Sequence, residues 1–222
     1  MNEPTTFPVA GRSTALIIRT ARFLLLAVLL SVWPFSASSQ TLVTFDDIHS
    51  YSQGVEVPSA YQGLSWSNFW VLNSTLFSNG LGATGYCFGM VSPSNVVFNG
   101  LGNPAEIDSP GTNFNFLSAY LTGAWNSNLS IEVEGFNAAQ EIYDTIVVAG
   151  ATNATLFTFD YFNIDRLYFD SYGGESAGFG QGAGENFVMD NFTFEFVPEP
   201  STILLTVLGA VPLCAFLRRR RA

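Results

Sequence analysis

The sequence predicts an all-β protein, an antiparallel β-sandwich of the jelly-roll type, flanked by an N-terminal signal helix and a C-terminal transmembrane helix. Between residues 40 and 197, apolar and polar residues alternate in short stretches, and no window there shows a sustained helical period with caps. Gly, Asn and Ser fill the gaps between these stretches, as turns require. The predicted organisation is therefore a signal peptide at 1–39, a β-sandwich domain at 40–197 and a C-terminal segment with the transmembrane helix at 198–222.

The predicted signal peptide has three parts. Three arginines precede the apolar stretch 23–33, and small residues follow it at 36–39. A charged region, an apolar region and a small-residue exit define a secretory signal. Ala37 and Ser39 suit the residues before the scissile bond, so cleavage is expected after Ser39. A retained N-terminal anchor is the alternative.

The strands are predicted from period-two patterns rich in aromatic and β-branched residues. In chain order they fall at 42–45, 64–69, 96–98, 116–121, 130–134, 145–149, 156–159, 167–169 and 187–196. The last strand should place Phe192, Phe194 and Phe196 on one face of its sheet. Asn191, Thr193 and Glu195 should then lie on the other face.

The longest loop expected in the domain is Tyr172–Gly184, which is rich in glycine. Loops of this length are usually functional or mobile. The loop lacks the lysine and the following helix of a phosphate-binding loop, so nucleotide binding is excluded.

The charge of the domain restricts its partners. The chain contains no lysine, and residues 40–197 hold sixteen acidic residues against the single Arg166, a formal charge of −15 (1 − 16). This excess argues against nucleic acid and against anionic membrane surfaces. Cys87 has no partner cysteine within the domain, so no internal disulfide is expected, and a buried apolar role is favoured.

The C-terminal segment combines a rigid motif, an apolar run and a basic end. The motif is Val197, Pro198, Glu199 and Pro200; the run is 203–217; the end is Arg218, Arg219, Arg220 and Arg221. A helix of 15 residues spans roughly 22 Å, shorter than a comfortable membrane crossing, and Pro212 interrupts it. The arginines can snorkel to the headgroups and hold the C-terminus on the cytoplasmic side.

This order of motif, apolar run and arginines resembles the PEP-CTERM sorting signal of Gram-negative bacteria, the substrate of exosortase-type membrane enzymes. The resemblance covers about the last 25 residues. It implies export, transient anchoring in the inner membrane, and then release or attachment at the cell surface or in the extracellular matrix. A plain C-terminal membrane anchor, without processing, is the alternative.

The domain itself resembles a β-sandwich family found among PEP-CTERM proteins. The pieces that carry the resemblance are 44–47, 63–69, 92–98, 133–136 and 188–194. The architecture is similar to galactose-binding-like jelly rolls and carbohydrate-binding modules. The resemblance implies a binding or structural module, with extracellular polysaccharide as the expected partner.

A calcium site is expected where the first and last strands meet. Asp46 and Asp47 end the first strand and Asp190 lies in the last, and such strands are often neighbours in a jelly roll. Calcium prefers six to eight oxygen ligands, and carbonyls of the Gly-rich loop with Glu175 or Glu185 would complete the shell. The alternative is a strand-end turn with solvated carboxylates.

Ligand binding by aromatic rings is expected at Trp70 or Trp125, which both lie beside Asn-rich stretches. Most other aromatic residues should build the core. His49 is the only histidine and lacks the partners of a zinc site, so it is interpreted as a surface loop residue.

The sequence contains no obvious catalytic set. Glu132 and Glu134 share one face of a strand about 7 Å apart, a spacing that suits an acid/base pair but that any alternating acidic strand shows. The favoured hypothesis is an exported, non-catalytic protein with a structural or carbohydrate-binding role. The alternative is an extracellular polysaccharide hydrolase that uses paired carboxylates.

Overall fold

The structure is a computed structural model that describes residues 39–180 and 182–198. The expected signal helix, the transmembrane helix, Glu199, Pro200 and the four C-terminal arginines lie outside the described residues. Within 39–180 and 182–198, none of the helices has the length and apolarity that a membrane crossing needs.

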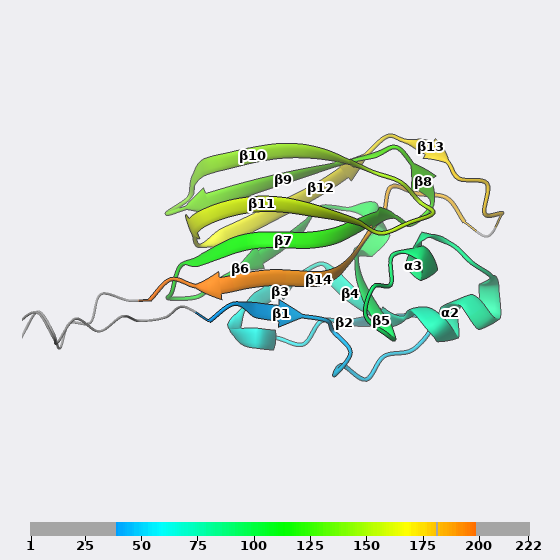
Figure 1. Cartoon of the computed structure of the whole chain (residues 1–222), viewed down its shortest axis with the longest axis horizontal. Coiled ribbons are helices and arrows are strands. Elements are labelled where there is room, and N and C mark those ends of the chain that lie inside the picture. Colours follow the sequence, from blue (N-terminus) through cyan, green and yellow to red (C-terminus); the bar gives the residue numbers. More distant parts are fainter. Residues whose placement is uncertain (1–38, 181, 199–222) are drawn as a thin grey trace, which may run out of the picture. The chain divides into compact units, whose positions relative to one another are not determined.

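Two antiparallel sheets form the domain (Figure 1), which confirms the predicted β-sandwich. The seven-stranded sheet, here the large sheet, runs in the order β11 (Thr155–Ile164), β7 (Phe114–Gly123), β14 (Phe187–Phe196), β5 (Asn95–Asn99), β4 (Phe69–Asn73) and β2 (Val55–Glu56), and β1 (Thr41–Val43) also pairs with β14. The small sheet runs in the order β10 (Gln140–Ala149), β9 (Leu129–Asn137), β12 (Arg166–Tyr172), β6 (Ala105–Asp108) and β3 (Ser65–Ser67). A separate ribbon pairs β8 (Asn126–Ser127) with β13 (Glu175–Ser176).

The main core lies between the two sheets and is built largely from aromatic rings. Phe116 of β7 stacks on Phe159 of β11 and Phe192 of β14, with ring centroids 4.7 and 4.9 Å apart. Across the sandwich, Phe169 of β12 meets Phe69 of β4 edge-on at 5.7 Å. Each buried ring removes about 150–250 Å² from water, so these contacts dominate the stability of the domain.

Strand β14 shows how the alternating pattern positions side chains. Its bounds match the predicted 187–196, and Phe192 and Phe194 are fully buried as expected. The register with β7 shifts between Asp190 and Thr193, and Asn191 there adopts a positive φ of 52°. Because of this bulge, the strand points Met189 and Phe192 into the same core although they are three residues apart.

Short helices, which no sustained helical period in the sequence indicated, lie between some of the strands. Helices α2 (Ser74–Leu81) and α3 (Gly85–Phe88) and the 3-10 turns η1 (Tyr61–Gly63) and η2 (Gly100–Gly102) interrupt the strands. Asn73 caps α2 by accepting from the Leu76 N–H, and Thr84 caps α3 by accepting from the Tyr86 N–H. These helices are too short to show a sustained helical period, so the sequence pattern did not indicate them.

The two helices cover part of the outward face of the large sheet. Phe77 of α2 and Tyr86 of α3 pack with Leu72, Val96 and Val188 of the sheet in a second, smaller core. Helix α3 lies directly on the backbone of the sheet, because a Cβ on Gly85 would stand 1.9 Å from the Gly123 carbonyl oxygen. Only glycine permits this approach.

The chain enters and leaves the domain at the same end (Figure 1). β1 and β14 are antiparallel neighbours, with Thr41 opposite Phe194 and Val43 opposite Phe192. Past β14, the Val197 N–H donates to the Asn113 carbonyl oxygen at 2.8 Å. The contacts of the sandwich therefore extend to Val197, the first residue of the predicted sorting motif.

Candidate functional site

A hollow of about 390 Å³ opens beyond the end of β1, and we call it the rim hollow. Three segments meet there: the loop after β1, the cap of α2 and the start of β5. Its lining residues are Asp46, Asp47, Ile48, His49, Ser50, Asn73, Leu76, Ser94 and Asn95.

The buried side chain of Asn95 fixes the wall of the rim hollow. Its Nδ2 donates to the carbonyl oxygens of Phe45 and Ile48 at 2.7 and 2.8 Å, and its Oδ1 accepts from Ser50 Oγ at 2.7 Å. Its backbone N–H donates to Asp46 Oδ1 at 2.9 Å. The Asn95 side-chain amide therefore satisfies both ends of the 45–50 loop, and the Asn95 backbone N–H holds Asp46 in a fixed direction.

The rim hollow offers acceptors beside exposed rings. Asp46 Oδ1 accepts from the Asn95 backbone N–H, and Asp47 Oδ1 accepts from the Tyr61 hydroxyl at 2.6 Å. Within the described part of the chain, the Oδ2 atoms of both carboxylates have no hydrogen-bond partner. Burial and the adjacent Asp47 carboxylate raise the pKa of Tyr61, so its hydroxyl stays a donor. The rings of His49 and Tyr51 meet edge-on at 5.0 Å, and both side chains are exposed.

The expected calcium ligands do not come together. The first and last strands are neighbours, as predicted, but Asp190 is fully buried and its carboxylate holds the turn after α3. It accepts from the N–H groups of Val91 and Ser92 at 2.7 and 2.8 Å, from Ser92 Oγ and from its neighbour's N–H. Among residues 39–180 and 182–198, no three His, Cys, Asp or Glu side chains are grouped to hold a metal ion. The ligand set of Asp46, Asp47 and Asp190 therefore does not form.

The environment of Asp190 changes its titration. Burial raises its pKa to about 6, although the hydrogen bonds from Val91, Ser92 and Asn191 act in the opposite direction. The Asp190 carboxyl group thus has a structural role, because its hydrogen bonds connect β14 to the turn at 91–92. A sequence pattern cannot show such a contact, because its partners lie almost a hundred residues apart.

The two tryptophans proposed for ligand stacking are both half-buried. The Trp70 indole lies against Gly100, where a Cβ would stand 2.7 Å from its Nε1. Trp125 meets Tyr86 edge-on at 5.5 Å, and the Gly182 backbone lies over its six-membered ring. Both rings therefore contribute surface to packing within the domain, and Trp125 anchors the Gly-rich loop.

The paired glutamates lie on the outward face of the small sheet. Glu132 and Glu134 are half-exposed on β9 and alternate with the buried Ile131 and Val133. Burial, and then the carboxylates around it, raise the pKa of Glu134. Neither glutamate lines any of the three hollows described here, and both lie on the same face of one strand. Glycoside hydrolysis uses two carboxylates on opposite sides of the scissile bond, whereas these two lie side by side.

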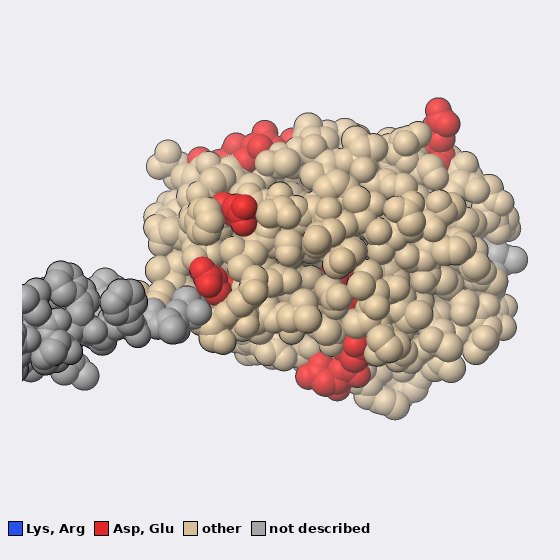
Figure 2. Space-filling model, viewed as in Figure 1, with Lys and Arg blue, Asp and Glu red and all other residues tan. Residues whose placement is uncertain are grey.

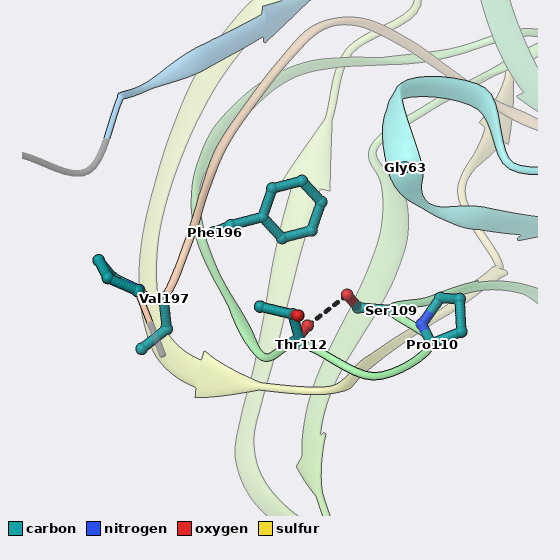
Figure 3. A pocket seen from close by; sticks show the side chains of 7 residues that line it. Gly63, Ser109, Pro110, Thr112, Phe196 and Val197 are labelled. Atoms are coloured by element: carbon teal, nitrogen blue, oxygen red, sulfur yellow. Dashed lines mark hydrogen bonds between the residues drawn. The ribbon is translucent and has the colours of Figure 1, made fainter. Parts of the chain in front are cut away.

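Two further hollows adjoin at Ser109 and Pro110, at the end where the chain leaves. The first, of about 410 Å³, is lined by Gly63, Ser109, Pro110, Thr112, Phe196, Val197 and Pro198 (Figure 3). The Ser109 hydroxyl donates to the Thr112 carbonyl oxygen, and the Phe196 ring lies against Gly63. Val197 and Pro198, which begin the predicted sorting motif, thus form part of the surface of the sandwich. The second is described below.

No protein-family model matches the sequence, and no curated protein matches it. A DUF4465 family protein from Bacteroides caccae is similar in structure, with 13% identity and a TM-score of 0.44, over 72% of this chain and 93% of that one. A family two carbohydrate esterase from Cellvibrio japonicus aligns with 12% identity and a TM-score of 0.36, over 73% and 36%. The family 32 carbohydrate-binding module of C. perfringens NanJ, in complex with galactose, aligns with 12% identity and a TM-score of 0.27, over 74% and 96%. At these identities and TM-scores the likenesses assign no ligand and no activity to this chain.

Proposed function

We propose that this chain is an exported, non-catalytic β-sandwich that binds neutral glycans at the rim hollow. The observation that carries the proposal is the pair of carboxylates, Asp46 and Asp47, each with one oxygen free among the described residues, in a hollow that the exposed His49 also lines. The Tyr51 ring meets His49 edge-on next to that lining. Sugar hydroxyls donate to carboxylate oxygens, and the apolar faces of pyranose rings pack on aromatic side chains. A hollow of about 390 Å³ lies within the range of small-ligand sites.

The charge of the rim hollow selects among glycans. Its lining has two carboxylates and no Lys or Arg. Phosphorylated, sulfated or uronate sugars would meet like charge there, so uncharged hexoses and their oligomers are the favoured ligands.

Export and sorting form the second part of the proposal, and they rest on the signal-like N-terminus and the PEP-CTERM-like tail. The position of the rim hollow supports them. The chain enters at Thr41 and leaves after Phe196 at one end, whereas Asp46 follows the other end of β1. A domain tethered through its C-terminal tail would therefore present the rim hollow away from the tether, toward polysaccharide at the surface or in the matrix.

Glycan binding is tested on the full chain in mild detergent, first against an array of neutral oligosaccharides and then by titration calorimetry. Asp47→Asn should weaken binding about tenfold or more, because a hydrogen bond to a charged acceptor contributes about 1.5–3 kcal/mol. Glu175→Gln is the matched control, because Glu175 is an exposed acid outside the hollow. Equal loss in both variants, or no neutral glycan bound, would refute the proposal.

Sorting is tested separately by intact mass spectrometry of the protein from its native host. Removal of the tail near Pro198–Glu199–Pro200 would support an exosortase-type partner. A mature chain that still ends in Arg221-Ala222 would instead indicate a plain membrane anchor.

A further inference from the structure

Arg166 is the only basic residue between positions 40 and 197. It begins β12, the central strand of the small sheet, where it lies between Phe136 of β9 and Asp108 of β6. Its guanidinium lies over the Phe136 ring, with Cζ 4.2 Å from the ring centroid. This cation–π contact holds the charged group in one place.

The guanidinium has unused donors. Among the residues that the structure describes, Arg166 makes no salt bridge and no side-chain hydrogen bond, and its Nε is buried without a partner. Asp165, its neighbour in the chain, uses Oδ2 to accept from the Ala138 N–H at 2.7 Å. A fixed guanidinium with free N–H groups is unusual in a domain with sixteen acids, because an Arg normally pairs when carboxylates are close.

Arg166, whose guanidinium has these free N–H donors, lines an open hollow. We call this hollow of about 350 Å³ the arginine hollow, and it is lined by Asp108, Ser109, Pro110, Ala139, Asp165 and Arg166. The next outward residue of β12 is the half-exposed Tyr168, about 7 Å further along the strand. The hollow thus combines one fork-shaped cation with two acids that can accept from hydroxyls.

We infer that the arginine hollow binds a uronate, the carboxylate-bearing sugar of acidic polysaccharides. The planar guanidinium matches a carboxylate in a bidentate pair, and Asp108 and Asp165 would accept from the sugar hydroxyls. At physiological ionic strength, screening confines the repulsion from distant acids to about 8 Å, so binding is decided within the hollow, by the attraction of Arg166 against the repulsion of Asp108 and Asp165. This site is distinct from the rim hollow in residues, in position and in the charge of its ligand.

The test titrates the full chain in mild detergent with oligogalacturonate and, as the matched probe, with the same oligomer as its methyl ester. The acid should bind about tenfold or more tightly than the ester. Arg166→Gln should abolish that difference, whereas Arg166→Lys should keep part of it, because an ammonium group gives a point contact in place of the fork. Asp47→Asn should leave the affinity for the acid unchanged and should weaken only binding of the neutral ester at the rim hollow, which separates the two sites.

In the Asp47→Asn chain, whose rim hollow is weakened, equal affinity for acid and ester would overturn the inference, and so would an Arg166→Gln variant that still prefers the acid. Thermal melting of each variant shows whether it is folded. If Arg166→Gln does not fold, the comparison of acid with ester on the unaltered chain and on Arg166→Lys decides the matter. If the Asp47→Asn variant binds oligogalacturonate as tightly as the unaltered chain does, uronate binding does not depend on the rim hollow.

Discussion

The two outward faces of this sandwich differ: helices cover part of one, and the other is exposed. The large sheet points Leu72, Val96 and Val188 outward, and α2 and α3 cover them to form the second core. The small sheet points Glu132 and Glu134 outward, and the helices of the described residues, α2 and α3, pack on strands of the large sheet instead. In the view of Figure 2, acidic side chains appear in separate patches on the described surface and no basic side chain is seen.

This difference follows from the outward side chains alone. Apolar residues on both faces of a strand require a second layer, whereas alternation with acids leaves one face in water. The covered face therefore contributes to stability, and the uncovered face is free for recognition. Four changes test the comparison.

The largest effect is expected at Gly85, where α3 touches the sheet. Gly85→Ala should destabilise the chain by more than about 4 kcal/mol, because the new Cβ would overlap the Gly123 carbonyl and neither backbone can move freely. Gly80→Ala in α2 is the control: nothing lies within 4 Å, and alanine in an exposed helix should stabilise by about 0.5–1 kcal/mol. Urea unfolding of both variants measures the contrast, and equal midpoints would show that α3 is not seated as described.

A smaller effect separates the covered face from the uncovered one. Phe77→Ala should cost about 3 kcal/mol, because it leaves a cavity against Tyr86 and Trp125. Ile146→Ala on β10 removes a side chain that is 53% exposed, and it should cost less than about 0.5 kcal/mol. The same unfolding experiment applies. A large loss at Ile146 would mean that another surface covers the small sheet.

Acid should stabilise the domain through Asp190. Its pKa is raised from 3.8 to about 6 by burial, so the folded state holds this proton more tightly than the unfolded state. The resulting stability is complete below about pH 4 and is lost as pH rises through 6. Between pH 7.5 and pH 5 the stability should therefore rise by roughly 1 kcal/mol.

Asp190→Asn should flatten that pH profile of the melting temperature. On the uncovered face, Glu134→Gln should change it much less, because water screens the half-exposed Glu134 although burial raises its pKa in the same direction. If the unaltered chain melts at a lower temperature at pH 5 than at pH 7.5, the direction assigned to Asp190 is wrong.

The smallest effect concerns calcium. With only Asp46 and Asp47 near one another, millimolar calcium should stabilise the chain by less than about 1 kcal/mol. Asp47→Asn should remove that response and Asp190→Asn should leave it intact, as melting curves with chelator and with calcium would show. If Asp190→Asn instead loses the calcium response, then Asp46, Asp47 and Asp190 bind calcium together, as the sequence predicted.

The alternating strands could be predicted from the sequence, because one face of each strand is buried. The bounds of β14 were predicted correctly, whereas the predicted strand 64–69 is divided by Asn68, which has a φ of 58°. The Asn68 amide turns the chain by donating to the carbonyl oxygens of Gly100 and Pro104. Such partners are distant in the sequence, so local patterns do not reveal the break.

The candidate sites were predicted only in part. Asp46 and Asp47 were identified because they end a strand, but Asn95, which organises the loop around them, looks like an ordinary turn residue. Arg166 was visible as the single cation of the domain. Its unpaired state depends on the register of β12 with β9 and β6, which composition does not determine.

The antiparallel pairing of β1 with β14 has a mechanical consequence. If the tail is held at a membrane or wall while a glycan pulls on the rim hollow, tension enters β14 along its own length. The hydrogen bonds of β14 to β1, β5 and β7 would then be loaded in parallel, as in shear, and would have to break together. A pull at right angles to the strand would open them one after another at lower force. The strand that connects this domain to its tail is thus also the one best placed to carry tension between a cell and its matrix.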